Sequence, residues 1–195
     1  MARIVIFTGS PGSGKTSVAN LIRRRAHGKR YRIVSMGTLM ESEARRMRLI
    51  SDRDQIRGLA TRQIDLLRAH AFRQVARLSG KIILDMHASV ASNGRYTPGM
   101  PERYMRTLKG LRAFIYIDAD DGELIMRRIN DKNRKRERET RSEISTHRLI
   151  NLAMLAQRAA DLNISLYILH NRQGKLVETA EKAMSVLDAV FEGKW

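Results

Sequence analysis

The 195-residue sequence contains no cysteine, only three prolines and few aromatic residues. The absence of cysteine excludes disulfide bonds, thiolate metal sites and a cysteine nucleophile, and it is compatible with a reducing cytoplasm. The low proline count and the hydrophobic fraction of 43% argue against a long disordered region and for one compact domain. With 5% aromatic residues and no aromatic-rich stacking motif, the chain lacks the usual marks of an RNA-binding fold.

Long hydrophobic runs are also missing. No segment approaches the roughly 18 apolar residues that a membrane helix needs. The N-terminal sequence MARIVIFTGS is too short an apolar stretch for a signal sequence. We therefore expect a soluble, cytoplasmic protein.

Acidic residues are scarce, and the first of them is Glu41. The chain has 37 Lys and Arg residues against 20 Asp and Glu residues, which gives a formal net charge of +17. A field of this sign attracts polyanions such as nucleotides, nucleic acids or anionic lipid. A solvated, arginine-rich surface without such a partner explains the same charge, so both interpretations stay open.

Short β-rich runs alternate with segments of helical periodicity along the whole chain. Strands are expected at residues 2–8, 31–35, 81–85, 113–117 and 164–169. Helices are expected at residues 15–27, 38–49, 60–78, 102–108, from 122, at 142–161 and at 176–190, with a Gly/Pro-rich loop between 85 and 102. Continuous apolar strands that alternate with helices indicate an α/β fold in which a parallel sheet is covered on both faces.

The segment Gly9-Ser10-Pro11-Gly12-Ser13-Gly14-Lys15-Thr16 follows the first expected strand directly. It matches the phosphate-binding pattern G-x4-G-K-[ST], with a strand before it and a helix after it. Small residues let successive backbone N–H groups turn toward a phosphate, and the helix N-terminus adds positive potential. Lys15 would neutralise the β- and γ-phosphates, and the Thr16 hydroxyl would ligate Mg²⁺. The loop predicts binding of a nucleoside triphosphate and leaves the reaction open.

A second magnesium-binding group is expected at the end of another apolar strand. Asp85 follows the sequence KIIL and could hold Mg²⁺ through water. A role in capping the strand end explains the same residue.

A small kinase is the P-loop class that the rest of the chain favours. We find neither N-K-x-D nor D-x-x-G, as a GTP switch protein would need, and transporter and AAA-type ATPases are usually longer and carry further motifs. Residues 127–138 are rich in arginine, which suits a mobile lid over the transferring phosphoryl group. A solvated, charge-alternating helix is the alternative for that segment.

These features together resemble the archaeal-type adenylate kinases, a branch of the P-loop nucleoside monophosphate kinases. The matching blocks are GSPGSGKT (9–16), MGTLM (36–40), RDQIR (53–57), LDMH (84–87) running into YTPGMP (96–101), and RRIND (127–131) with Arg134 and Arg136, trailed by His147 and Asn151. The blocks follow the family order across nearly the whole chain. The first is common to P-loop proteins, whereas the RDQ-x-R block and the DxH…PG loop are together fairly specific.

The resemblance implies the reaction ATP + AMP ⇌ 2 ADP with Mg²⁺ in a single kinase domain over residues 1–195. It implies a five-stranded parallel sheet with helices on both faces, an AMP-binding insertion at about residues 36–60 and a short lid at about 127–141. Family members are often trimeric, so a homo-oligomer is expected. Glu137 and Arg138 depart from the family pattern in the lid.

By position, the resemblance assigns AMP binding to Gly37, Thr38, Met40, Arg53, Arg57, Pro98 and Gly99. Arg53 and Arg57 would grip the phosphate, because one helical turn between them lets both side chains face one anion; surface ion pairs with Asp52 or Asp54 are the alternative. Pro98-Gly99 is interpreted as a turn over the AMP base.

Lys15, Arg128, Arg134 and Arg136 are the expected catalytic residues, of which the three arginines would cover ATP and stabilise the transferring phosphoryl group. A kinase of another nucleoside monophosphate remains an alternative, because base selectivity depends on pocket contacts. An RNA-associated P-loop ATPase is the more distant alternative.

Overall fold

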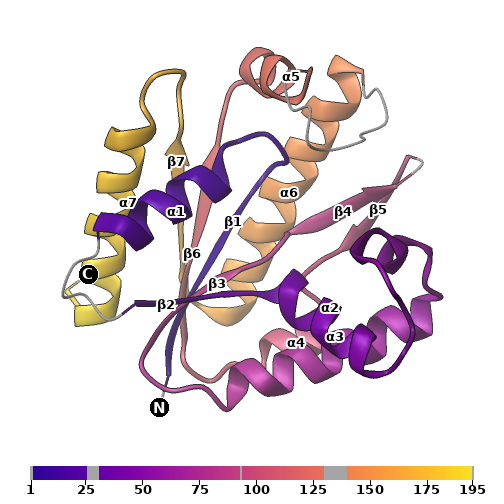
Figure 1. Cartoon of the computed structure of the whole chain (residues 1–195). Coiled ribbons are helices and arrows are strands. Elements are labelled where there is room, and N and C mark those ends of the chain that lie inside the picture. Colours follow the sequence, from indigo (N-terminus) through magenta and orange to yellow (C-terminus); the bar gives the residue numbers. More distant parts are fainter. Residues whose placement is uncertain (1, 26–30, 93, 130–139, 195) are drawn as a thin grey trace.

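The computed structural model describes residues 2–25, 31–92, 94–129 and 140–194. Within these ranges, five parallel strands form one sheet in the order β2-β3-β1-β6-β7, and two more form an antiparallel hairpin (Figure 1). The strands of the main sheet are β1 (Arg3–Gly9), β2 (Tyr31–Ser35), β3 (Lys81–Asp85), β6 (Leu111–Asp118) and β7 (Ser165–His170). The hairpin strands are β4 (Ser89–Ser92) and β5 (Arg95–Pro98). The five-stranded parallel sheet is therefore as predicted.

Helices cover both faces of the sheet, as the sequence predicts. The helices of the described ranges are α1 (Lys15–Arg25), α2 (Met36–Arg46), the 3₁₀ helix η1 (Arg53–Gly58), α3 (Thr61–Ala76), α4 (Glu102–Met105), α5 (Asp121–Ile129), α6 (Arg141–Leu162) and α7 (Leu176–Glu192). Helices α1 and α7 lie on one face, and α3 and α6 lie on the other (Figure 1). None of the helices in these ranges is both long and apolar enough to cross a lipid bilayer.

The core divides into two clusters because neighbouring side chains of a strand point to opposite faces. Ile4 and Ile6 of β1 pack toward α3 and α6, whereas Val5 and Phe7 pack toward α1 and α7. All four side chains are buried, which explains why β1 reads as a continuous apolar run rather than as an alternating pattern.

Helix α6 begins and ends where local chemistry requires. The Thr140 hydroxyl accepts from the Glu143 N–H, and the Glu143 carboxylate accepts from the Thr140 N–H in return. Asn163 ends the helix in the left-handed region at φ 50°. The observed helix extends the predicted one by one residue at each end.

The segment expected to be a Gly/Pro-rich loop contains the β4–β5 hairpin instead. Gly94 takes φ +71° near the tip, and Ser92 pairs with Arg95 across the two strands. Pro98 ends β5 opposite Ser89, at an edge position where its missing N–H is tolerated. The interpretation of Pro98-Gly99 as a turn is therefore wrong for Pro98, which belongs to a strand, while Gly99 lies in a bend.

Candidate active site at the carboxyl edge of the sheet

The phosphate loop and Asp85 lie at the carboxyl ends of neighbouring parallel strands. Phe7 of β1 is level with Asp85 of β3, and Gly9 is level with Ile117 of β6. Asp118 of β6 is in turn level with His170 of β7. Strand ends of a parallel sheet converge on one edge, where ligands of open α/β folds bind.

The phosphate loop connects β1 to α1 in a conformation that depends on its glycines. Gly12 and Gly14 take φ values of +91° and +84°, which side chains with a Cβ rarely adopt. At Gly9, a Cβ would lie 2.5 Å from the Ile117 carbonyl oxygen and 2.7 Å from the Ser13 hydroxyl. The three glycines of the motif are thus explained by backbone conformation and by the close approach of β6.

Side chains from later in the sequence hold the carbonyl groups of this loop. Arg128 Nε donates to the Pro11 carbonyl at 2.8 Å, and Asn171 Nδ2 donates to the Ser13 carbonyl at 2.8 Å. Because C=O and N–H point in opposite directions across a planar trans peptide, these bonds direct the N–H groups of Gly12 and Gly14 to the other side of the loop. Such an arrangement of N–H groups suits an anion.

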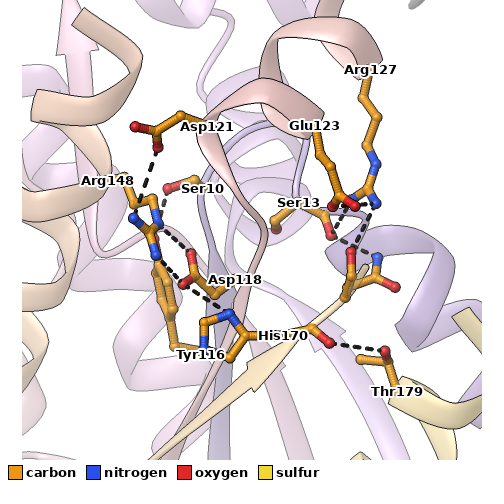
Figure 2. Close-up of polar contacts among 11 residues, drawn as sticks. Ser10, Ser13, Tyr116, Asp118, Asp121, Glu123, Arg127, Arg148, His170 and Thr179 are labelled. Carbon is orange, nitrogen blue, oxygen red and sulfur yellow. Dashed lines mark hydrogen bonds and ion pairs between the residues drawn. The ribbon is translucent and has the colours of Figure 1, made fainter. Parts of the chain in front are cut away.

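Arg127 adds a second contact to the same region. Its guanidinium donates to the Ser13 carbonyl at 3.3 Å and to the Asn171 carbonyl at 2.8 Å, and it pairs with Glu123 at 3.0 Å (Figure 2). The carboxyl end of α5 is therefore attached to the phosphate loop and to the end of β7. Arg134 and Arg136, the other predicted lid arginines, lie outside the described residues.

Lys15 and Asp85, which were predicted for the phosphates and for Mg²⁺ respectively, form an ion pair with each other. The Lys15 side chain is 11% exposed and that of Asp85 is 28% exposed. Lys15 is the first residue of α1, and Asp85 is the last residue of β3. Thr16 follows in the first turn of α1 and is exposed. The structure thus brings Lys15 and Asp85 into contact, and Thr16 is the residue after Lys15 in the same helix.

An ion pair between Arg148 of α6 and the buried Asp118 lies at the carboxyl end of β6. Arg148 of α6 binds the Asp118 carboxylate with two parallel hydrogen bonds of 2.7 and 2.6 Å, and it also lies 3.8 Å from Asp121 (Figure 2). His170 Nδ1 is 3.5 Å from the same Asp118 carboxylate. The bonds to Asp118, whose side chain is 1% exposed, raise the pKa of Arg148 above its usual range. The pair ties α6 to the end of β6.

The residues predicted for AMP lie around the start of α2 and on η1. Ser35 caps α2 by accepting from the Thr38 N–H at 3.4 Å, which is why the helix begins at Met36, two residues before the predicted start. Arg53 reaches Gly37, where a Cβ would lie 3.4 Å from Arg53 Nη2, and it pairs with Glu41 at 3.7 Å. The structure therefore brings Gly37, Thr38 and Arg53 together.

The geometric argument that joined Arg53 to Arg57 does not hold. Both residues lie in η1, a 3₁₀ helix, in which residues three apart align and residues four apart do not. The Arg57 side chain lies outside what the structure describes. Met40 is half-buried and packs against two apolar clusters.

Gly99 is required by the close approach of two backbones. Its N–H donates to the Ala88 carbonyl at 2.8 Å, and a Cβ there would overlap the His87 carbonyl. The end of the hairpin is thereby fixed beside the segment that follows Asp85.

Several functional contacts were not among the predicted site residues. Asn171 and Arg127 bond to the phosphate loop, and Asp118 binds Arg148 at the end of β6, yet none of them belongs to the loop motif. A signal existed for two of them, because Asp118 ends a strand and Asn171 follows one, as Asp85 does. A polar residue at the carboxyl end of any strand of a parallel sheet is therefore a candidate site residue.

Comparison with known proteins gives matches over nearly the whole chain. The chain is 30% identical over 191 residues to an adenylate kinase of Thermococcus sibiricus, with 96% of each protein covered. It is 33% identical over 183 residues to an adenylate kinase of Thermoplasma acidophilum, covering 93% of this chain and 97% of that protein. A family model described as an AAA domain matches residues 8–145. That match includes the phosphate loop and qualifies the sequence-based argument against AAA-type ATPases, while the relatives matched over their full length are kinases.

Solved structures confirm the fold. A shikimate kinase from Acinetobacter baumannii superposes with a TM-score of 0.63 at 12% identity, covering 97% of this chain and 94% of that one. A gluconokinase from Sinorhizobium meliloti superposes with a TM-score of 0.54 at 17% identity, covering 98% of this chain and 94% of that one. At such identities the likeness concerns the arrangement of sheet, helices and phosphate loop.

Proposed function

The chain belongs to the adenylate kinase family, with an AAA domain over residues 8–145, and on this premise we propose that it transfers a phosphoryl group reversibly from ATP to AMP, giving two ADP. It is a phosphotransferase. The observation that carries the proposal is the identity to adenylate kinases over 93 to 96% of the chain, which spans the donor loop and the predicted acceptor segments alike.

ATP would bind through residues Gly9, Ser10, Pro11, Gly12, Ser13, Gly14, Lys15 and Thr16. The directed N–H groups of Gly12 and Gly14 and the N-terminus of α1 support this proposal, because both offer positive potential to a phosphate. A triphosphate in this loop would compete with Asp85 for the Lys15 ammonium. Lys15 would then follow the β- and γ-phosphates and stabilise the charge on the transferring group.

Mg²⁺ is the divalent ion that the site suits. Thr16 would supply a hydroxyl, and the Asp85 carboxylate would bind through water; both are hard oxygen donors of the kind Mg²⁺ prefers. Asp85 is partly exposed at the strand end, and the exposed Thr16 lies in the first turn of the helix that Lys15 begins. The bound ion would neutralise charge on the phosphates. The residues present therefore fit the ion.

AMP would bind across α2, η1 and the hairpin. We assign to it Gly37, Thr38, Met40, Arg53, Arg57, Pro98 and Gly99. The proximity of Arg53 to Gly37 and the N-terminus of α2 support a phosphate at this place, since a guanidinium fork and backbone N–H groups both bind phosphate oxygens. The lack of a side chain at Gly37 leaves room beside the Arg53 guanidinium.

Three arginines would cover ATP and stabilise the transferring phosphoryl group: Arg128, Arg134 and Arg136. For Arg128, the bond from Nε to the Pro11 carbonyl supports the assignment because it keeps the guanidinium on the phosphate loop. The insertion at 36–60, the lid at 127–141, the trimer and the cytoplasmic location stay predictions from the family resemblance.

A panel of acceptors tests the proposal. Phosphoryl transfer from Mg·ATP is measured in parallel to AMP, CMP, UMP, GMP and water, with and without RNA, using Lys15→Ala as the inactive control. Fast ADP formation with AMP alone is the expected result. Preferred turnover of CMP or UMP would reassign the protein to another monophosphate, and RNA-stimulated hydrolysis without transfer would reject the kinase proposal.

A further inference from the structure

A row of buried polar side chains runs from β6 and the phosphate loop through α6 to the β4–β5 hairpin. Its members are Tyr116, Ser10, Asn151, Ser89 and His147, and none is more than 3% exposed. Ser10 Oγ lies 2.7 Å from Tyr116 OH and 3.4 Å from Asn151 Nδ2. Ser89 Oγ lies 2.7 Å from Asn151 Oδ1 and 3.1 Å from His147 Nε2. Buried polar groups are costly unless they are bonded, so the row is a specific connection.

Asn151 is the centre of this row, and its amide has one possible orientation. The Ser89 backbone N–H lies 3.0 Å from Asn151 Oδ1, and an N–H can only donate. The oxygen of the amide therefore faces Ser89, and the nitrogen faces Ser10. The Ser89 hydroxyl donates its hydrogen bond to the same oxygen. It therefore accepts from His147, whose ring carries a hydrogen on Nε2 in this arrangement.

The two ends of Asn151 reach the two substrate regions. Ser10 belongs to the phosphate loop, where the donor would bind. Ser89 is the first residue of β4, opposite Pro98, and it lies four residues after Asp85. In Figure 1, α6 passes between the loop region and the hairpin. A single side chain thus spans the gap from donor loop to acceptor hairpin.

We propose that Asn151 is a positioning residue for phosphoryl transfer, which sets the phosphate loop at a fixed distance from the β4–β5 hairpin through Ser10 and Ser89. The inference rests on the proposed function and extends it to a residue outside the segments assigned to either nucleotide. Phosphoryl transfer depends on alignment of the two reacting oxygens, and a displacement of about 1 Å is enough to lower the rate about 100-fold.

The chemistry of the row explains why an amide is needed. Asn offers an acceptor to Ser89 and a donor to Ser10, whereas leucine offers neither and an ionised aspartate offers only acceptors. A protonated aspartate, in contrast, again has one acceptor and one donor in nearly the same shape. Tyr116 of β6, whose pKa burial raises to about 12, His147 on α6, and the Arg148–Asp118 pair are the titratable or charged neighbours.

The experiment compares Asn151→Leu, Asn151→Asp and Ser89→Ala with the wild type, and uses Leu155→Ala as control. Leu155 is a buried apolar residue one turn further along α6 that makes none of the hydrogen bonds of the row, so its truncation lowers stability and leaves those bonding groups in place. The assay measures kcat, the dissociation constants of ATP and of AMP measured singly, and the pH profile, at a temperature where every variant is folded.

Asn151→Leu is expected to lower kcat about 100-fold, because alignment is lost, while each nucleotide alone binds within about 3-fold of the wild type. Ser89→Ala should show a smaller loss of kcat, and Leu155→Ala should keep the wild-type kcat. The activity of Asn151→Asp relative to the wild type should rise as pH falls from 8 to 5, while that of Asn151→Leu stays constant.

Two results would overturn the inference alone: a wild-type kcat in Asn151→Leu and Ser89→Ala, or equal relative activity of Asn151→Asp at all pH values. If Leu155→Ala loses as much kcat as Asn151→Leu, the effect is one of stability, and the inference also fails. If the wild type itself makes no ADP from AMP, the proposed function is wrong, and the inference that rests on it is wrong as well.

Discussion

The Lys15 ammonium and the Asp85 carboxylate form an ion pair between the start of α1 and the end of β3. The two residues are separated by 70 positions in the sequence, and the parallel pairing of β1 with β3 brings them to one edge. Their charges neutralise each other at the place where a triphosphate and its metal ion are proposed to bind. The pair therefore connects the donor site to the segment that leads into the acceptor hairpin.

Replacing Lys15 by methionine, which keeps much of the side-chain length, should lower kcat/KM for ATP by about 10² to 10³, the usual effect of removing one charged group that stabilises a transition state. Steady-state kinetics at saturating AMP measures this. Lys182→Met is the control, because Lys182 is exposed and pairs with Glu178 on the outer surface of α7. Equal effects of the two substitutions would contradict the role of Lys15.

Gly14→Ala should abolish most ATP-dependent activity. The new Cβ would be strained at φ +84° and would overlap the Asn171 amide that binds the Ser13 carbonyl. Gly80→Ala is the matched control, because Gly80 has φ +87° and its Cβ would meet nothing within 4 Å. Both variants should lose about 1 to 2 kcal/mol from backbone strain alone. Calorimetric titration with ATP should separate them, with only Gly14→Ala losing affinity.

The phosphate loop and its flanking elements could be predicted from sequence because their determinants are local. Glycines at 9, 12 and 14 follow an apolar strand, and the first turn of α1 carries Lys15. The contacts that hold the loop are not local: Asn171 lies 158 residues after Ser13. Such a contact depends on strand order, which the pattern of apolar residues does not specify.

The four-residue spacing of the buried side chains on α6 indicates a core position for two polar residues. His147, Asn151, Leu155 and Ala159 follow one another at intervals of four residues, and all are buried on one stripe of the helix. Leu155 and Ala159 predict that this stripe of the helix faces the core, and His147 and Asn151 lie on the same stripe. A polar residue at a core position of a helix therefore indicates a buried bonding partner, although sequence alone does not identify Ser10 or Ser89 as that partner.

Breaking the Asp118–Arg148 pair should destabilise the fold strongly. Arg148→Met leaves the Asp118 carboxylate buried without its two guanidinium bonds, and removal of one partner from a buried pair costs about 3 to 5 kcal/mol. Chemical denaturation should show this loss. In the double variant Asp118→Asn with Arg148→Met the loss should be smaller than the sum of the two single effects; additive effects would contradict a direct coupling.

Helix α2, which carries part of the predicted AMP site, should lose stability in acid. Two bonds from the Arg46 guanidinium, at 3.0 and 2.5 Å, and one contact from His70 lower the pKa of Glu43 to about 2, against the opposing effect of burial. Because the pKa is lower in the folded state than its ordinary value of 4.5, ionised Glu43 stabilises the fold above that value. This stabilisation is lost as pH falls from about 5 to about 2.

Unfolding free energies of the wild type and of Glu43→Gln, measured between pH 7 and pH 2, should therefore converge at the acid end. Glu41→Gln, at a more exposed pair with Arg45, serves as control and should show little change of this kind. A constant difference between wild type and Glu43→Gln at all pH values would show that the Glu43 charge does not act in this way.

The fate of the terminal phosphoryl group tests the central claim most directly. ATP labelled with ³²P at the γ-position is mixed with AMP, Mg²⁺ and the protein, and the products are separated before the reaction reaches equilibrium. The account predicts that the label appears at the β-position of the ADP formed from AMP, and that Lys15→Met slows this transfer by about 10² to 10³. Recovery of the label as inorganic phosphate, with AMP unchanged, would contradict it.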